Sequence, residues 1–320
     1  MLRMSKAVRG AVVVASAAAL TLSGFTAASA ATPAETTPAE TTSATAGLTA
    51  PQVRVMASFD IGQMQQPDNI VLESGGSVVV SLLWAGQVAR VFPDGTVDVL
   101  ASFDGGTAAG MVRGADGYLY VLHRSGNDPN GLYRIVPGNS TPQLYAALPD
   151  VTVPNGLAVD GDVFYLTDSS SGVVWKVEDG TATEWLSSPV LAPATPEGFG
   201  ANGLHIKDNA LWVAQAEAGL LTRVPMQQDG SAGTLEIKAT GLTGIDDWVF
   251  TGNGDEILAA INRQNKVVVV HPDGTNTTFV DGINSPTSVA LKGNKVYISS
   301  ADLVNELDPK LLVAKWSPQP

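Results

Sequence analysis

The 320-residue chain contains no cysteine, and only 15% of its residues are charged. A disulfide scaffold, a zinc–thiolate site and thiol catalysis are therefore excluded, because each of them requires cysteine. Basic residues are also scarce, since 18 Lys and Arg stand against 31 Asp and Glu and give a formal net charge of −13. Nucleic-acid binding depends on a basic surface that displaces counterions, so we expect no nucleic-acid partner.

The first thirty residues have the pattern of an export signal. Arg3, Lys6 and Arg9 precede an apolar, alanine-rich stretch, and Ala28-Ser29-Ala30 offers the small residues that a signal peptidase accepts. The apolar stretch is too short for a membrane span, and a lipoprotein anchor would need a cysteine. We therefore predict a signal peptide over residues 1–30, cleaved after Ala30, and a secreted, extracellular protein without membrane insertion.

Residues 31–50 (ATPAETTPAETTSATAGLTA) contain almost nothing that could build a core. Their prolines and the repeated Ala-Glu-Thr-Thr predict a disordered tether that is open to glycosylation. Cleavage after Ala30 would remove three positive charges and no negative ones, which leaves 15 basic against 31 acidic residues. The acidic character of the chain would therefore increase on export.

From residue 51 onward one sequence unit recurs six times. Its opening segments are PDNIVLESGG (67–76), AAGMVRGADG (108–117), PNGLAVDGDV (154–163), ANGLHIKDNA (201–210), IDDWVFTGNG (245–254) and PTSVALKGNK (286–295). Alternating apolar strands follow, with tight turns such as Pro93-Asp94-Gly95-Thr96, in which glycine supplies the positive φ of a hairpin. Intervals of 41 to 47 residues between units are typical of four-stranded blades. The sequence thus predicts an all-β, six-bladed β-propeller over residues 51–320.

The two ends of this domain are expected to complete one blade together. The segment 55–60 (VMASFD) echoes 99–104 (VLASFD), the outer strand of the first blade, whereas the last unit stops at Trp316 after three strands. An N-terminal strand in the last blade would close the ring and hide two sheet edges.

The residues that open the first strand of each blade should meet at one mouth of the central channel. Their equivalent positions are Asp68, Ala109, Asn155, Asn202, Asp246 and Thr287. Four of them bring oxygen donors together with no cation in the set, and a divalent cation would relieve the repulsion. Carboxylate and amide oxygens suit calcium better than zinc, so we predict one central Ca²⁺ held by Asp68, Asn155, Asn202 and Asp246. In the alternative interpretation, Asn-Gly and Asp-Asp at strand starts are ordinary turn chemistry that needs no metal.

A second set of residues is predicted beside the ion, because each second strand runs back to the same mouth. By the same alignment these residues are Leu82, His123, Asp168, Gln215, Asn262 and Ser300. We assign substrate binding to Asn155, His123, Asp168, Gln215 and Asn262. For His123 a place in a surface loop is the alternative, and His205, inside a strand, is expected to pack between blades.

The run PNGLAVDGDVFYLTDSSSGVVWKV (154–177) resembles a blade of the senescence-marker-protein, gluconolactonase and regucalcin-like hydrolases. The resemblance implies a six-bladed propeller with a central calcium, acting on lactones and, in relatives, on organophosphate esters. In that family a Glu, two Asn and an Asp hold the metal, which implies Asn155, Asn202 and Asp246 as ligands here. Asp68 stands where the family has Glu, and its reach is shorter by about 1.5 Å, which weakens coordination or leaves room for a water.

Two functions are compatible with these features. The first is a calcium-dependent hydrolase of lactones or related esters. In it the metal polarises the carbonyl, Asp246 is general base or nucleophile, Asn155 and Asn202 orient the small-molecule substrate, and His123 and Asp168 bind its hydroxyls or move a proton. The second is a non-catalytic extracellular binding propeller for a glycan or a partner protein, since one fold hosts many functions. We expect a monomer.

Overall fold

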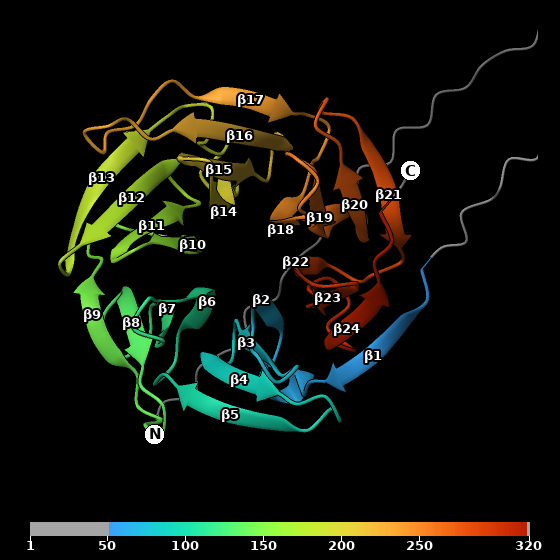
Figure 1. Ribbon diagram of the computed structural model, residues 1–320. Helices are drawn as coiled ribbons and strands as arrows, with labels where there is room; N and C mark the ends of the chain where they lie inside the picture. Colours follow the sequence, from blue (N-terminus) through green and yellow to red (C-terminus); the bar gives the residue numbers. More distant parts are fainter. Residues whose placement is uncertain (1–50, 319–320) are drawn as a thin grey trace, which may run out of the picture. The chain divides into compact units, whose positions relative to one another are not determined.

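The computed structural model describes residues 51–318, so the predicted signal peptide and tether lie outside the described residues. Within this range the chain forms six four-stranded antiparallel sheets arranged as the blades of a ring (Figure 1). This confirms the predicted all-β, six-bladed propeller. Its two helical segments are the 3₁₀ turns η1 (Ile61–Gln63) and η2 (Asn262–Gln264). No helix of the described part has the length and apolar character to cross a bilayer.

Each blade has an inner, a second, a third and an outer strand. The inner strands are β2 (Pro67–Leu72), β6 (Thr107–Arg113), β10 (Pro154–Asp160), β14 (Ala201–Lys207), β18 (Ile245–Phe250) and β22 (Pro286–Lys292). The second strands are β3 (Val78–Leu82), β7 (Leu119–Arg124), β11 (Val163–Asp168), β15 (Ala210–Gln215), β19 (Ile257–Ile261) and β23 (Lys295–Ser300). We number the blades 1 to 6 in this order.

The remaining strands complete the blades toward the rim. The third strands are β4 (Gln87–Val91), β8 (Gly131–Ile135), β12 (Val173–Glu178), β16 (Leu220–Pro225), β20 (Lys266–Val270) and β24 (Lys310–Lys315). The outer strands are β5 (Val97–Ser102), β9 (Gln143–Ala147), β13 (Thr181–Ser187), β17 (Glu236–Ala239), β21 (Asn276–Asp281) and, in blade 6, β1 (Val53–Ser58).

Blade 6 is closed by the N-terminal strand. Strand β1 runs antiparallel to β24, with Val53 opposite Ala314 and Ser58 opposite Lys310. In Figure 1 the blue β1 accordingly lies beside the red β24. The predicted closure is confirmed, and it removes the open edge that β24 would otherwise present.

The repeated Pro-Asp-Gly-Thr turns join the third strand to the outer strand. In blade 5 the Asp273 carboxylate accepts a hydrogen bond from the Thr275 backbone N–H at 3.0 Å, and Gly274 has a φ of 85°. In blade 1 Asp94 and Thr96 make the same contact at 3.0 Å, with Gly95 at φ 89°. Only glycine adopts this backbone conformation without strain. The local sequence therefore fixes these hairpins.

The hydrophobic core is divided into six clusters, and each cluster lies between two neighbouring blades. The second strands are buried on both faces, which is why apolar residues dominate them, as in the continuous apolar run Ile257–Ile261. Between blades 4 and 5 the fully buried indoles of Trp212 and Trp248 lie 6.5 Å apart. This packing fixes the angle between adjacent blades and therefore the geometry of the channel.

Candidate functional site

Every inner strand contains a β-bulge near its start. In blade 3 the pairing of β10 with β11 jumps from Pro154 to Leu157, so β10 has one extra residue there, and the other five inner strands show an equivalent irregularity. A bulge ends regular pairing and re-aims side chains. The bulged residues are the equivalent positions of the repeat, namely Asp68, Ala109, Asn155, Asn202, Asp246 and Thr287, and all six line one cavity of about 280 Å³.

The two carboxylates of this ring, Asp68 and Asp246, have raised pKa values. Burial, and after it the nearby Asp247, raises the pKa of Asp68 to about 7. Burial, followed by the charges of Asp68 and Asp247, raises the pKa of Asp246 well above its usual range, although hydrogen bonds from Asn262 (3.1 Å) and Asn202 act in the opposite direction. Buried carboxylates that lie beside other negative charges are more stable with a bound proton or a bound cation than as free anions.

The ring fits a hard divalent cation. The Asn202 Oδ1 atom is buried without a hydrogen-bond partner, and a buried amide oxygen is expected to have one. Across residues 51–318 no group of three or more His, Cys, Asp or Glu side chains is arranged as a metal site. The ring itself offers two carboxylates and two amides, an all-oxygen set that suits calcium and would be formally neutral with it.

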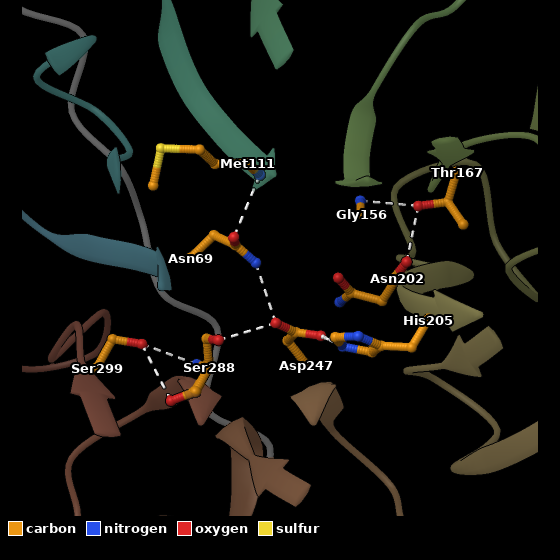
Figure 2. A network of polar contacts seen from close by, with 9 residues as sticks. All are labelled: Asn69, Met111, Gly156, Thr167, Asn202, His205, Asp247, Ser288 and Ser299. Atoms are coloured by element: carbon orange, nitrogen blue, oxygen red, sulfur yellow. Dashed lines mark hydrogen bonds and ion pairs between the residues drawn. The ribbon is translucent and has the colours of Figure 1, made fainter. Parts of the chain in front are cut away.

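A second layer of side chains lies one residue further along the inner strands (Figure 2). The imidazole Nε2 of His205 donates to Asp247 Oδ1 at 2.9 Å, and Asp247 Oδ2 accepts from Asn69 Nδ2 at 3.0 Å and from Ser288 Oγ at 2.8 Å. The Asn69 amide oxygen accepts in turn from the Met111 backbone N–H at 3.2 Å. This network joins five of the six blades directly behind the ring. His205 also packs on Trp248 of blade 5, with ring centroids 4.5 Å apart, so it lies between blades as expected while its Nε2 joins the network.

Buried hydroxyl groups hold the bulges to the neighbouring blades. Thr167 Oγ1 accepts from the Gly156 backbone N–H at 2.9 Å and donates to the Asn202 carbonyl at 2.7 Å. Ser299 Oγ accepts from the Ser288 N–H at 2.8 Å and donates to the Asp68 carbonyl at 2.7 Å. Sequence reasoning missed these residues, because a Thr or Ser inside an apolar strand shows nothing of the bulge that it supports.

Glycine fills the second-layer position in blades 2, 3 and 4. A Cβ atom on Gly156 would lie 2.5 Å from the Asn202 carbonyl oxygen, and one on Gly203 would lie 2.7 Å from the Asp246 carbonyl oxygen. At Gly110 it would collide with the carbonyl of Asn155. The Asn-Gly pairs of the repeat are therefore required by the close approach of adjacent inner strands.

We expect Gly156→Ala to destabilise the propeller by about 1–3 kcal/mol, because the added methyl group meets the backbone of blade 4 and the strands have to separate. Urea unfolding followed by tryptophan fluorescence measures this change. Gly75→Ala is the matched control, since its Cβ would meet no atom within 4 Å and its φ is not positive. Equal unfolding midpoints for the two variants would contradict the close-packing account.

The structure brings Asn262 to the ring but places the rest of the second predicted set elsewhere. In the other blades the predicted residue lies opposite the residue that precedes the ring position. In blade 5 that residue is Ile245, which lies opposite Ile261, so our alignment of this blade was wrong by one residue. Asn262 reaches Asp246 because η2 begins there and turns its side chain back to the channel. The others do not line the cavity and are buried at the ends of their strands: Leu82, His123, Asp168, Gln215 and Ser300.

Three of these polar side chains hold the loop that leads into their own inner strand. Asp168 accepts from the Thr152 and Val153 backbone N–H groups at 3.0 Å each. Burial acts to raise the pKa of Asp168, but hydrogen bonds from Thr152, Ser170 and Val153 outweigh it and lower the pKa below its usual value. Gln215 Nε2 donates to the Ala192 carbonyl at 2.9 Å, and Ser300 Oγ donates to the Asn284 carbonyl at 2.8 Å. Their geometry serves positioning of the loops rather than direct contact with a substrate.

His123 lies in the core between blades 1 and 2, neither in the cavity nor in a surface loop. Its Nδ1–H donates to the Thr107 carbonyl at 2.9 Å, and its ring stacks on Phe103 with centroids 4.1 Å apart. Burial lowers the pKa of His123, against the opposing effect of the Thr107 carbonyl. A neutral, enclosed imidazole of this kind is not placed to exchange protons with a substrate at the ring.

The rest of the cavity wall is mostly apolar. Among its lining residues are Trp84, Phe199 and Leu303, together with Arg124 and Arg263. A groove of about 610 Å³ continues from it past Trp84 and Arg124. Apolar walls with a few convergent polar groups are the usual composition of a small-molecule site.

Several solved structures resemble the propeller. A gluconolactonase from Xanthomonas campestris is 17% identical, with a TM-score of 0.64, and the match covers 83% of this chain and 89% of that one. A calcium-binding regucalcin from Agrobacterium tumefaciens is 15% identical, with a TM-score of 0.64 over 84% and 97% of the two chains. An auxiliary nutrient binding protein from Bacteroides ovatus is 13% identical, with a TM-score of 0.64 over 84% and 76%.

The likeness is one of fold. The gluconolactonase and regucalcin-like propellers are structural neighbours of this chain, as the run 154–177 indicated. At these identities the similarity shows the architecture alone. No family model and no curated protein sequence matches the chain.

Proposed function

We propose that this protein is a secreted, calcium-dependent hydrolase of lactones or related esters, acting as a monomer on a small-molecule substrate. The observation that carries the proposal is the ring itself. Two carboxylates of raised pKa and a buried amide oxygen without a partner open into an apolar cavity of about 280 Å³. The similar folds of a gluconolactonase and a regucalcin are compatible with this chemistry.

The ring residues divide the work of hydrolysis. Asp68, Asn155, Asn202 and Asp246 would hold the calcium ion, which supplies a Lewis acid that polarises the carbonyl and stabilises the oxyanion. The Asp246 carboxylate, oriented by Asn262 Nδ2 at 3.1 Å, takes a proton from the attacking water or attacks the carbonyl itself. In the general-base path the water oxygen bonds to the carbonyl carbon, the ester C–O bond breaks, and the proton passes to the leaving alkoxide.

A substrate panel with and without a chelator tests this proposal. We expect hydrolysis of at least one class of lactone or ester, loss of the activity in EDTA, and its return when excess calcium is added. Calorimetric titration of calcium into chelator-stripped protein measures the binding independently of any substrate. Turnover that is unaffected by chelation would contradict a calcium-dependent mechanism.

One observation favours the alternative of a non-catalytic binding propeller for a glycan or a partner protein. His123 and Asp168 do not line the cavity, so its titratable lining consists of Asp68, Asp246 and two arginines. An auxiliary nutrient binding protein also shares the fold. Calcium binding without turnover of any panel member would support this function.

A further inference from the structure

The charged side chains of the cavity wall balance one another, and a bound cation would make the wall positive. Its charged lining residues are Asp68, Asp246, Arg124 and Arg263. A calcium ion on the two carboxylates would leave the two arginines as a net charge of +2, in a chain whose formal net charge is −13. A cationic pocket in an acidic protein concentrates anions at one place on its surface.

The two arginines have no carboxylate partner of their own. Among the other arginines of residues 51–318, Arg90 and Arg113 pair with Glu73 and Arg223 pairs with Glu236, whereas Arg54 and Arg134 form no ion pair. No ion pair in this range involves Arg124 or Arg263, although Glu306 lines the groove beside Arg124. Both residues therefore line the cavity without a carboxylate within ion-pair distance in the described part of the chain.

Arg124 is the better placed of the two. It ends β7, is half-buried, and lines both the cavity and the adjoining groove. Arg263 lies in η2 of blade 5, on the other side of the ring, and is exposed (Figure 1). Solvent screens an exposed charge more strongly, so Arg124 should contribute more to binding.

Exposed apolar side chains line the same cavity and groove as Arg124. Trp84 and Phe199 are 46% and 45% exposed, and Trp84 lines the cavity and the groove together with Arg124. Met64, 56% exposed, lies further along the groove. Large apolar surfaces left open beside a pocket are typical of a ligand contact.

We infer that the substrate is an amphiphilic carboxylate: an ester or lactone with an apolar body that packs on Trp84 and Phe199 and a carboxylate group that pairs with Arg124. The ester or lactone group of this substrate rests on the proposed hydrolase function. Its carboxylate rests on the residues that line the cavity. Arg124 is thus a specificity-determining residue, and its planar guanidinium suits a two-point hydrogen bond with a carboxylate.

The test compares two esters that differ in one terminal group, mono-4-nitrophenyl adipate and 4-nitrophenyl hexanoate, with the calcium-loaded protein. We expect kcat/KM to favour the carboxylated ester by about 10- to 100-fold, the range of one hydrogen bond between charged groups. Arg124→Gln should remove most of this ratio and Arg263→Gln a smaller part. Arg223→Gln, on β16 far from the cavity, is the control and should keep the ratio.

Equal rates for the two esters would overturn the inference and leave the hydrolase intact. A ratio that survives Arg124→Gln would overturn it as well, because the carboxylate would then be bound elsewhere, for instance by the metal. If neither ester is turned over, the substrate panel decides the hydrolase, and calorimetry with 4-phenylbutyrate and 4-phenyl-1-butanol decides the inference. Tighter binding of the carboxylate that is lost in Arg124→Gln supports the anion site, and equal binding of the two overturns it.

Discussion

Asp246→Ala is expected to abolish hydrolysis while the propeller stays folded. The carboxylate is at once a predicted ligand of the metal and the predicted base, and removing a general base alone costs about 100- to 10,000-fold in rate. We therefore expect kcat to fall by at least about 1,000-fold. Initial rates on the best panel substrate measure the loss, and circular dichroism with thermal unfolding verifies the fold.

Two further variants separate the roles of Asp246. Asp246→Asn keeps an oxygen for the ion but cannot take a proton, so calcium binding should persist, weakened, while turnover is lost. Asp98→Ala, on the outer strand β5, is the matched control and should behave as wild type. Unchanged activity in Asp246→Ala would remove the mechanism, whatever the metal content of the protein.

Calcium should bind about 90-fold more weakly at pH 5 than at pH 8, because protons compete for Asp68. Its pKa of about 7 means that the carboxylate is almost fully ionised at pH 8 and about 1% ionised at pH 5. Protonation of Asp246, whose pKa is also raised, makes the dependence steeper. Calorimetric titrations at several pH values measure the effect.

The same shift predicts how the stability of calcium-free protein depends on pH. The pKa of Asp68 is higher in the folded state than the ordinary value of 3.8. Its contribution therefore favours the folded state most below pH 3.8, declines as the pH rises to about 7, and is constant above that. Asp68→Asn should flatten both profiles, and a calcium affinity that does not change between pH 5 and pH 8 would contradict the ring as the binding site.

The repeats made the ring residues predictable from the sequence. The directions in which single side chains point were not predictable. Asp68, Asn155, Asn202 and Asp246 could be found because six copies of one unit place equivalent residues around a common axis. The second set depended on which way the last residue of each second strand points. That direction alternates from residue to residue, and Asp168 and Gln215 bond to loops instead of facing the channel.

The residues of the second layer could have been predicted from the same alignment of the repeats. Asn69, Asp247 and Ser288 stand one residue after the ring positions, and the glycines of blades 2 to 4 stand at the same place. What the sequence does not show is the bulge, which turns two consecutive residues toward the channel where a regular strand would turn one. Without it, Asp247 and His205 could not be placed together.

The pairing of Val53 with Ala314 sets an order of events for a newly made chain. Strand β1 is the first strand of the propeller to be synthesised and its partner β24 is the last, so the pair cannot form until the other strands have been made. Until then its backbone groups have no sheet to join, and contacts between residues so distant in sequence form slowly. Closure of blade 6 therefore has to wait for the end of the propeller, and a chain that stops short of β24 would leave blade 6 incomplete and β1 without a partner.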